Sequence, residues 1–441
     1  MAINTKQFNL ISLGCPKNRV DAERILAVMS HAGFVYTHDA AAAEVIVINT
    51  CAFIVPAVEE SIAAILDVRA ENSRAFLIVA GCLPQRYGED LRESLPEVNL
   101  FVTPDQIRDL PRIVHSALSP ESESSSQRLH GPLLSPGARI LTTRGYAYLR
   151  IAEGCSRCCT YCTIPSIRGP LQSFDPTDME QEALTLASQG VRELVLVAQD
   201  LTSYGTDRQE KKALIRLLQR IGKIEGIRWV RLMYLHPDGV PRDLPRIIRE
   251  SETILRYLDI PIQHVSGTVL RAMGRPWKGD RIRKLVDRLR SEIPGLVLRT
   301  TLMVGFPGEG DKEFRELMDF VKAYSIERVG VFTYSPEDDT PALALGDPVP
   351  NKVKQQRADE IRELHSKFST RRNRGKIGTH QQALVEGSSD ESEFLLQGRT
   401  WDQAPEIDGV LYITAGTAVA GEIHKVRITG AHGADLFGEI E

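Results

Sequence analysis

Short apolar runs alternate with amphipathic stretches along most of the chain. Three runs in the first part have the length and β-branched content of buried strands, at 8–13, 45–50 and 76–80. Six similar runs follow, at 147–151, 193–198, 229–234, 255–260, 296–304 and 329–334. Buried strands that alternate with helices are typical of parallel sheets, so the pattern predicts an α/β protein with two parallel blocks.

A polar segment separates the two blocks. Residues 119–126 consist only of Ser, Pro and Glu, a composition typical of linkers, and we expect the linker to cover 119–140. From about residue 376, short β-rich segments and frequent glycine replace the helical stretches, which favours a small antiparallel barrel. We therefore expect three domains, at 1–118, 141–370 and 376–441.

The composition is that of an ordinary globular protein, with 42% hydrophobic and 25% charged residues among 441. The first residues show no basic region followed by an apolar run, and no stretch of about 18 apolar residues would span a membrane. Together with seven cysteines, these features predict a cytoplasmic protein without a membrane partner. The net charge of −4 says little about other partners.

Three cysteines follow the first strand of the second block within eight residues. Cys155, Cys159 and Cys162 have the spacing C-x3-C-x2-C. A [4Fe-4S] cube has four irons and normally takes four thiolates, so three ligands from one loop leave one iron open. The spacing therefore indicates an iron-sulfur cluster that can bind a further ligand.

A zinc site is the first alternative, because Cys158 adds two C-x2-C pairs to this loop. Zinc ribbons separate their two pairs by a long loop, which lets four thiolates reach tetrahedral positions. Here the pairs abut at Cys158 and Cys159, and adjacent residues of an extended loop point apart. A disulfide framework is less favoured than a zinc site, because the cysteine count is odd and a chain of this length can build a hydrophobic core without disulfide bonds.

The other three cysteines each follow one strand of the first block. Cys15, Cys51 and Cys82 are separated by 36 and 31 residues, about one βαβ repeat each. Ligands of parallel sheets bind at the carboxyl ends of the strands, so we expect these cysteines to converge on a second metal centre. A single buried cysteine is usually a small hydrophobic residue, but that reading does not explain three in the same topological position.

With these residues in view, the chain resembles the methylthiotransferases of the radical S-adenosylmethionine (SAM) superfamily, most of all the branch that modifies ribosomal protein S12. The resemblance covers nearly the whole length. The motifs that carry it lie at 12–21, 49–51, 81–83, 151–169, 198–205, 259–264, 299–309 and 334–342. Residues 398–409 resemble part of a TRAM domain.

This resemblance implies a fold and a set of cofactors. The fold is an N-terminal parallel α/β domain, a central partial (β/α)6 barrel and a C-terminal antiparallel TRAM barrel. The cofactors are SAM and two [4Fe-4S] clusters, a radical SAM cluster on the central cysteine triad and an auxiliary cluster on the N-terminal one. Cys158 has no counterpart among the expected ligands, and we interpret it as a spectator thiol.

The resemblance also suggests SAM contacts. Tyr161 occupies an aromatic position whose backbone commonly meets the adenine, and the turn formed by Gly305, Phe306 and Pro307 could approach SAM closely. Loop packing and a plain strand-to-helix turn explain these residues about as well. The two-glycine-acid motif expected to hold the methionine end of SAM is missing from 193–199, and the catalytic side chains stay unassigned.

The implied reaction is methylthiolation of the β-carbon of a specific aspartate of ribosomal protein S12. An unactivated C–H bond is not acidic enough for a side-chain base, so a cofactor must remove the hydrogen atom. The radical SAM cluster would reductively cleave SAM, with electrons from a donor such as flavodoxin or ferredoxin. The auxiliary cluster would carry the sulfur, so that two SAM molecules are used per product.

The alternative substrate is a transfer RNA adenosine, which close relatives modify. Residues 376–441 carry four basic and eleven acidic side chains, a net of −7, which is a poor surface for phosphates. An acidic face suits a basic ribosomal protein, so we expect Asp402, Glu406 and Asp408 to help dock S12, and tRNA to be an unlikely partner. We interpret the basic run 371–376 as a solvated helix end. A non-enzymatic iron-sulfur scaffold is the remaining alternative.

Overall fold

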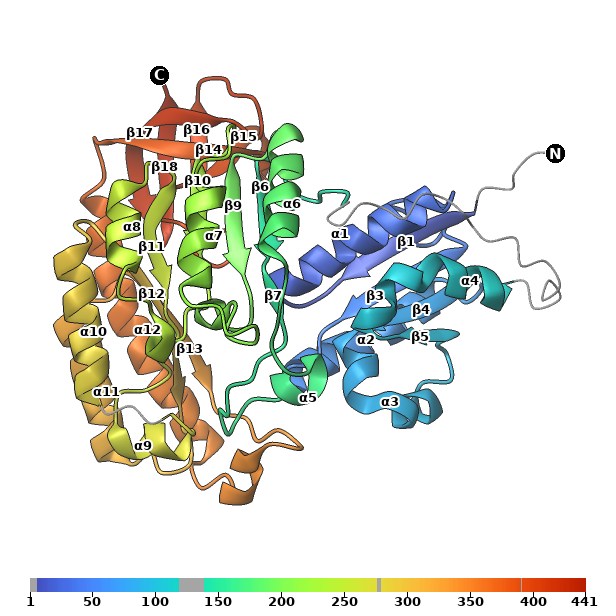
Figure 1. The fold of residues 1–441 in the computed structure, drawn as a ribbon, viewed down its shortest axis with the longest axis horizontal. Helices are drawn as coiled ribbons and strands as arrows, with labels where there is room; N and C mark the ends of the chain where they lie inside the picture. The colour runs from blue at the N-terminus through green and yellow to red at the C-terminus, as the bar shows by residue number, and fades with distance from the viewer. Residues whose placement is uncertain (1–5, 119–138, 276–278, 390) are drawn as a thin grey trace. The chain divides into compact units, whose positions relative to one another are not determined.

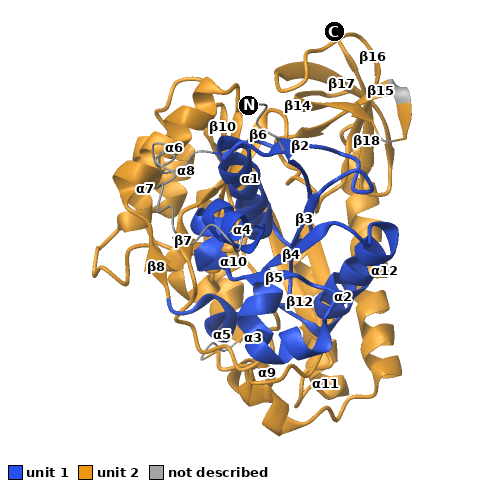
Figure 2. Cartoon of the chain, turned by 90° about the vertical axis from the view of Figure 1, so that its right-hand side faces the viewer, with its two compact units in different colours: residues 1–142, 163–170 blue, residues 143–162, 171–441 orange. Residues whose placement is uncertain are grey.

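The computed structural model describes residues 6–118, 139–275, 279–389 and 391–441. The chain forms two compact units (Figure 2). The first unit contains residues 1–142 and 163–170, and the second contains 143–162 and 171–441. Of the predicted linker 119–140, all but the last two residues lie outside the described part. The predicted domain limits stay predictions.

A five-stranded parallel sheet forms the centre of the first unit, in the order β2-β1-β3-β4-β5. Its strands are β1 (Gln7–Ser12), β2 (Val35–Tyr36), β3 (Val45–Thr50), β4 (Phe76–Gly81) and β5 (Leu100–Val102). The helices are α1 (Pro16–His31), α2 (Val55–Glu71), α3 (Cys82–Ser94), α4 (Leu110–Leu118) and α5 (Ile164–Arg168), with the 3-10 helix η1 (Pro104–Asp109) before α4.

Both faces of this sheet are buried. Ile46 and Ile48 belong to one apolar cluster, and Val45 and Val47, which point the other way, belong to a second. This explains why β3 reads as a continuous apolar run. The three predicted strands are confirmed, whereas β2 and β5, with two and three residues, were too short to predict.

The second unit begins with a six-stranded parallel sheet in the order β13-β12-β11-β10-β9-β6, which is not closed. Its strands are β6 (Tyr146–Arg150), β9 (Glu193–Val197), β10 (Trp229–Leu232), β11 (Ile254–Asp259), β12 (Val297–Val304) and β13 (Arg328–Thr333), all six predicted. The helices are α6 (Pro176–Ser188), α7 (Ala213–Ile221), α8 (Leu244–Glu250), α9 (Gly267–Ala272), α10 (Gly279–Glu292), α11 (Asp311–Tyr324) and α12 (Asn351–Arg374) (Figure 1). Shorter elements are the hairpin of β7 (Ala152–Glu153) and β8 (Gln172–Ser173) and the 3-10 helices η3 (Leu201–Ser203), η4 (Pro237–Gly239) and η5 (Pro341–Leu345).

The C-terminal strands close into a five-stranded barrel in the order β14-β15-β16-β18-β17. They are β14 (His380–Ser389), β15 (Ser392–Thr400), β16 (Leu411–Ala415), β17 (Ile423–His432) and β18 (Asp435–Ile440). The predicted small barrel is confirmed, but it is not wholly antiparallel. Strands β16 and β18 pair in parallel, because β17, which follows β16 in the chain, runs in the opposite direction and returns the chain to the end where β16 began.

This barrel packs on the strand starts of the six-stranded sheet through charged side chains. Asp402 is 3% exposed and pairs with Lys376 and with Arg328, the first residue of β13. The side chain of Asp408, also 3% exposed, accepts a hydrogen bond from the Tyr257 hydroxyl at 2.7 Å. The prediction that Asp402 and Asp408 form an exposed docking face is therefore wrong.

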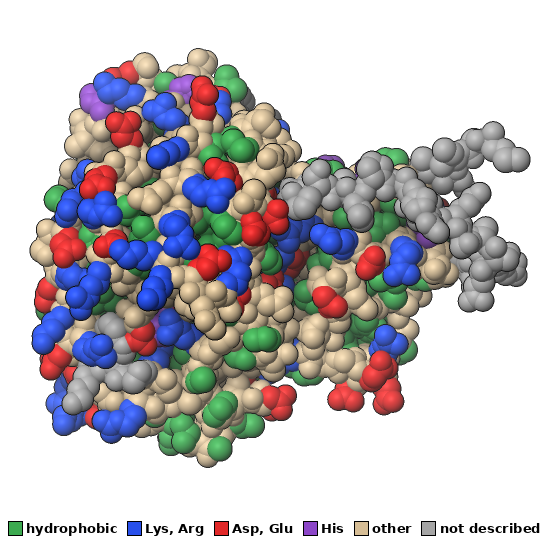
Figure 3. All heavy atoms as spheres, in the orientation of Figure 1, with side chains coloured by type: hydrophobic (Ala, Val, Ile, Leu, Met, Phe, Trp, Pro, Cys, Tyr) green, Lys and Arg blue, Asp and Glu red, His purple; other side chains and the backbone are tan. Residues whose placement is uncertain are grey.

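The other acidic groups of the barrel are largely compensated as well. Glu422 pairs with Arg192, Glu439 with Arg427, and the exposed Glu406 accepts a hydrogen bond from Tyr146. On the face of the molecule drawn in Figure 3, acidic and basic side chains are interspersed. Within the basic run 371–376, Arg372 donates to the backbone carbonyls of Ser325 and Glu327, and Lys376 pairs with Asp402.

Candidate metal centres

The N-terminal cysteines meet at the carboxyl edge of the first sheet. Cys15 follows β1, Cys51 follows β3 and Cys82 is the first residue of α3, directly after β4. These three strands are neighbours in the sheet. The Asn18 side-chain oxygen lies 3.8 Å from the Cys15 sulfur and 3.9 Å from the Cys82 sulfur. The structure thus brings together the three residues that the spacing predicts.

Gly14 allows the chain to pass close to Cys51. Its φ is +94°, a conformation that side chains disfavour. A Cβ at Gly14 would lie 2.6 Å from the Cβ of Cys51 and 2.9 Å from the amide nitrogen of Asn18. Asn18 is itself fixed by hydrogen bonds to the Leu13 and Thr50 carbonyls at 3.0 and 2.9 Å. The loops that carry the three cysteines are therefore held by contacts that leave no room for larger residues.

The donor set fits an iron-sulfur cluster with one open iron. Burial raises the pKa of Cys51, and it raises the pKa of Cys82 to about 11 although Arg168 opposes the rise. Buried neutral thiols of this kind lose their protons when a metal binds. Among the described residues, no group of three or more His, Cys, Asp or Glu is placed to hold a single metal ion.

The second triad lies at the carboxyl end of β6, in the loop after β7. The backbone N–H of Cys162 donates to the Cys159 carbonyl at 3.2 Å, and that of Arg157 lies 3.4 Å from the Cys155 sulfur. Burial raises the pKa of Cys155, partly offset by the hydrogen bond from Arg157. Three thiols on one short loop again match three corners of a cube.

Cys158 differs from the cysteines around it. Its side chain is exposed, whereas Cys155, Cys159 and Cys162 are half-buried. Its carbonyl faces Gly274, where a Cβ would come within 2.4 Å. The interpretation of Cys158 as a spectator thiol stays a prediction, and its exposure supports it.

The residues predicted to contact SAM pack in an aromatic cluster. Phe306 is fully buried between Tyr161 and Tyr334, with ring centroids 6.1 and 4.9 Å apart. Gly305 has a φ of +76°, and a Cβ there would lie 2.3 Å from the Lys354 side chain. Pro307 is also buried. A role in SAM binding stays a prediction for Tyr161, Gly305, Phe306 and Pro307.

Two amide side chains at the carboxyl ends of the strands were not predicted as site residues. Gln199 follows β9, and its side-chain nitrogen donates to Glu153 at 2.8 Å. Gln263 follows β11 with a φ of +67°, held by backbone hydrogen bonds to Thr301 and Met303. The side-chain oxygens of both glutamines are shielded from solvent and accept no hydrogen bond from the described residues. Both lie in motifs that carry the family resemblance, at 198–205 and 259–264, but glutamine has no characteristic spacing that would assign it a role.

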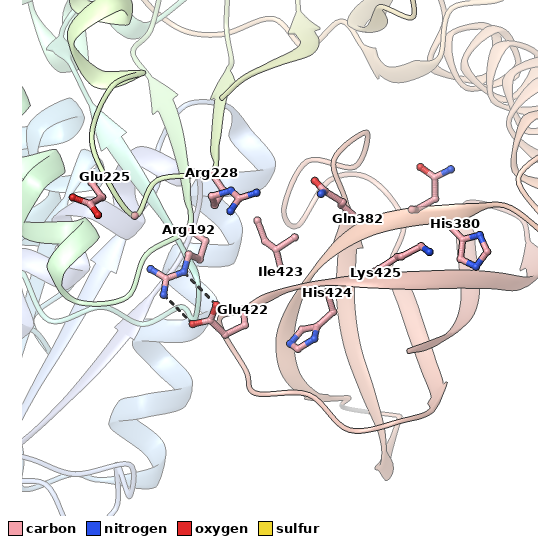
Figure 4. A pocket seen from close by; sticks show the side chains of 11 residues that line it. Arg192, Glu225, Arg228, His380, Gln382, Glu422, Ile423, His424 and Lys425 are labelled. Carbon is pink, nitrogen blue, oxygen red and sulfur yellow. Dashed lines mark hydrogen bonds and ion pairs between the residues drawn. The ribbon is translucent and has the colours of Figure 1, made fainter. Parts of the chain in front are cut away.

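A groove of about 690 Å³ lies at the opposite ends of these strands (Figure 4). Arg192, just before β9, pairs there with Glu422 at 2.9 Å. Arg228, His424 and Lys425 line the same groove. Because it lies at the amino ends of β9 and β10, it is separate from the loop that carries Cys155, Cys159 and Cys162.

Three family models match successive parts of the chain. The uncharacterized protein family UPF0004 matches residues 7–103, the radical SAM superfamily matches 149–321, and the TRAM domain matches 377–440. A ribosomal protein uS12 methylthiotransferase RimO from Trichlorobacter lovleyi is 43% identical, covering 99% of this chain and 98% of the relative. A protein of the same name from an Anaeromyxobacter species is 45% identical over 97% of this chain and 92% of its own.

This chain belongs to the radical SAM methylthiotransferase family. The fold agrees with a more distant solved structure, the radical SAM methyltransferase TsrM from Kitasatospora setae, which contains cobalamin and a [4Fe-4S] cluster. The TM-score is 0.56 at 14% identity, and 77% of each chain is covered. No helix of the described residues is long and apolar enough to cross a membrane.

Proposed function

We propose that this enzyme attaches a methylthio group to the β-carbon of a specific aspartate of ribosomal protein S12. The observation that carries the proposal is the similarity to the uS12 methylthiotransferases, which extends over 99% of the chain. The matched ranges of the family models, 7–103 and 149–321, cover the segments that carry the two cysteine triads. When bound, the clusters and SAM supply the radical that removes a hydrogen atom and the sulfur that replaces it. Flavodoxin or ferredoxin is the proposed electron donor.

Each group of residues has a proposed part in this reaction. Cys155, Cys159 and Cys162 hold the radical SAM cluster, and Cys15, Cys51 and Cys82 hold the auxiliary cluster. The side-chain oxygens of Gln199 and Gln263 accept hydrogen bonds from SAM. Two observations support this role for the glutamines. Both oxygens are buried acceptors without a hydrogen-bond partner among the described residues, and both lie at the strand ends where barrel enzymes bind ligands.

The net charge of the C-terminal barrel does not favour S12 over tRNA as the substrate. Asp402 and Asp408 are buried against arginines of the six-stranded sheet, so they are absent from the surface that meets a substrate. The proposal of S12 therefore depends on the full-length relatives, and tRNA becomes an outcome of the test.

The decisive experiment is mass spectrometry of S12 and of tRNA nucleosides from cells with and without this gene. We expect S12 from cells without the gene to be lighter by one methylthio group less the hydrogen atom that it replaces. The tRNA nucleosides of the two kinds of cell should be the same. Cells that carry Cys159→Ala at the normal protein level are the control, because they lack the reaction but retain the protein. Loss of a methylthio group from tRNA would contradict the proposal, and unchanged S12 and tRNA would favour the scaffold alternative.

A further inference from the structure

Arg168 directs two hydrogen-bond donors at the sulfur of Cys82. Its Nε lies 3.3 Å and its Nη2 3.1 Å from the Cys82 Sγ. The guanidinium is buried, with 3% of the side chain exposed. Arg168 is the last residue of α5, which belongs to the first unit (Figures 1 and 2).

Two further side chains fix the guanidinium in this orientation. Its Nη1 donates to the carboxylate of Asp21 at 3.1 Å, and Asp21 is also 3% exposed. Its Nη2 donates to the side-chain oxygen of Asn18 at 3.0 Å. Asn18 is the residue that lies between the sulfurs of Cys15 and Cys82. The planar fork of arginine suits such a site, because its donors hold fixed directions.

Arg168 therefore meets a sulfur as well as two oxygens. Arg69 in the same unit shows the contrast, since it donates to carbonyl oxygens such as those of Ala75 and Glu97, at 2.9 and 2.6 Å. A neutral thiol is only a weak acceptor, so it compensates poorly for a buried guanidinium. A metal-bound thiolate carries negative charge and accepts strong, charge-assisted hydrogen bonds. The placement of Arg168 therefore fits a Cys82 sulfur that ligates a metal.

The segment that carries Arg168 comes directly after the radical SAM triad. Residues 163–170 follow Cys162 in the chain, yet they belong to the first unit. Thr163 donates its hydroxyl to the Phe53 carbonyl at 2.9 Å, and Ile167, 3% exposed, packs in the core around β3 and β4. The loop that holds one proposed cluster is thus joined by five residues to the arginine that contacts a ligand of the other.

We infer that Arg168 is a positioning residue of the auxiliary cluster, which holds the Cys82 thiolate in place and raises the reduction potential of that cluster. Hydrogen bonds to ligating sulfurs are among the factors that set cluster potentials, and such supporting partners change metal affinity 10- to 100-fold. The inference rests on the proposed auxiliary cluster. It assigns no part in hydrogen-atom removal to Arg168.

The test uses the full chain with Cys155, Cys159 and Cys162 replaced by alanine, so that only the auxiliary cluster is loaded. Arg168→Met removes the charge, Arg168→Lys keeps the charge without the fork, and Arg69→Lys is the matched control. Iron content and the midpoint potential, followed by electron paramagnetic resonance, are the readouts. We expect Arg168→Met to lower the equilibrium constant for reduction of the cluster at least tenfold, which lowers the midpoint potential by about 59 mV for one electron. Arg168→Lys should lower the potential by less, and the Arg69→Lys control should leave it unchanged.

The outcomes distinguish the inference from the proposed function. A parent variant without iron would contradict the auxiliary cluster itself. Normal iron and an unchanged potential in both folded Arg168 variants would overturn the role of Arg168. Loss of iron from folded Arg168→Met, with the control loaded, would support it. If Arg168→Met does not fold, the potential of Arg168→Lys decides, because a lysine retains the charge that folding requires.

Discussion

Arg399 donates a hydrogen bond from Nη2 to the carboxylate of Glu193 at 2.7 Å, across 206 residues of sequence. Glu193 begins β9 and Arg399 lies in β15, and both side chains are buried. Arg231 of β10 donates to the same carboxylate at 2.6 Å. Glu193 therefore joins the six-stranded sheet to the C-terminal barrel, two parts of one compact unit.

Glu193→Gln should lower the free energy of unfolding by about 3–5 kcal/mol, because two buried guanidiniums lose their shared negative charge. Urea unfolding measures the change. Glu439→Gln is the control, since Glu439 pairs with Arg427 at the surface, where the loss should stay below about 1 kcal/mol. Equal effects of the two substitutions would show that burial of the Glu193 pair contributes nothing.

Asp402 should make the stability of the second unit sensitive to acid. Burial opposes its ionisation, but Lys376 and Arg328 hold the pKa of Asp402 below its ordinary value. When the folded-state pKa lies below the unfolded one, the ionised carboxylate adds a constant amount to the free energy of unfolding at every pH above the ordinary carboxyl pKa of about 4. This contribution is lost as the pH falls through the lowered folded-state pKa. We expect the Tm difference between the wild type and Asp402→Asn to be constant from pH 7 to 5 and to shrink below pH 4.

Thermal unfolding of both proteins over that pH range measures this effect. The difference between the two curves cancels the contribution of other carboxyls, such as Asp259, whose pKa is raised by burial. A difference that stays constant down to pH 3 would contradict the charge pairing of Asp402.

Anaerobically reconstituted protein should contain two clusters, about eight irons in total. Alanine at Cys155, Cys159 and Cys162 should remove about half of the iron, because the N-terminal cysteines form a complete site of their own. Iron analysis measures the change. Cys158→Ala is the matched control on the same loop and should keep all the iron, since its side chain is exposed. An iron deficit in Cys158→Ala would make that residue a ligand.

Replacement of Cys15, Cys51 and Cys82 by alanine should separate two activities. The variant should still form 5′-deoxyadenosine from SAM with dithionite, because the cysteines of the central loop are intact. It should form no methylthiolated S12, because the proposed sulfur-carrying site is gone. Chromatography of the nucleoside and mass spectrometry of S12 measure the two products. A folded variant that cannot cleave SAM would contradict this division.

The parallel strands and the placement of the N-terminal cysteines at their carboxyl ends were predictable because local patterns determine them. Buried parallel strands give continuous apolar runs, and Cys15, Cys51 and Cys82 each come within two residues of the end of one of these runs. The parallel pairing of β16 with β18 was not predictable, since it depends on how the chain returns through β17. Pairing between distant strands leaves no local signal in the sequence.

The role of the acidic C-terminal residues was mispredicted for a physical reason. Composition gives the number of charges, whereas burial depends on which partners the fold brings near. Asp402 and Asp408 meet Arg328 only because β13 begins beside the C-terminal barrel. Arg168 was missed similarly, because an arginine five positions after Cys162 has no pattern that links it to Cys82.

The crossing of residues 163–170 into the first unit also bears on how the protein is made. Translation releases the amino end first, at about 5–20 residues per second. When residue 118 leaves the ribosome, the five strands of the first sheet are available, but the core still lacks Ile167 and Cys82 still lacks Arg168. A nascent chain therefore presents its N-terminal thiols before their guanidinium neighbour exists. A fragment that ends in the linker would never gain the contact between Arg168 and Cys82.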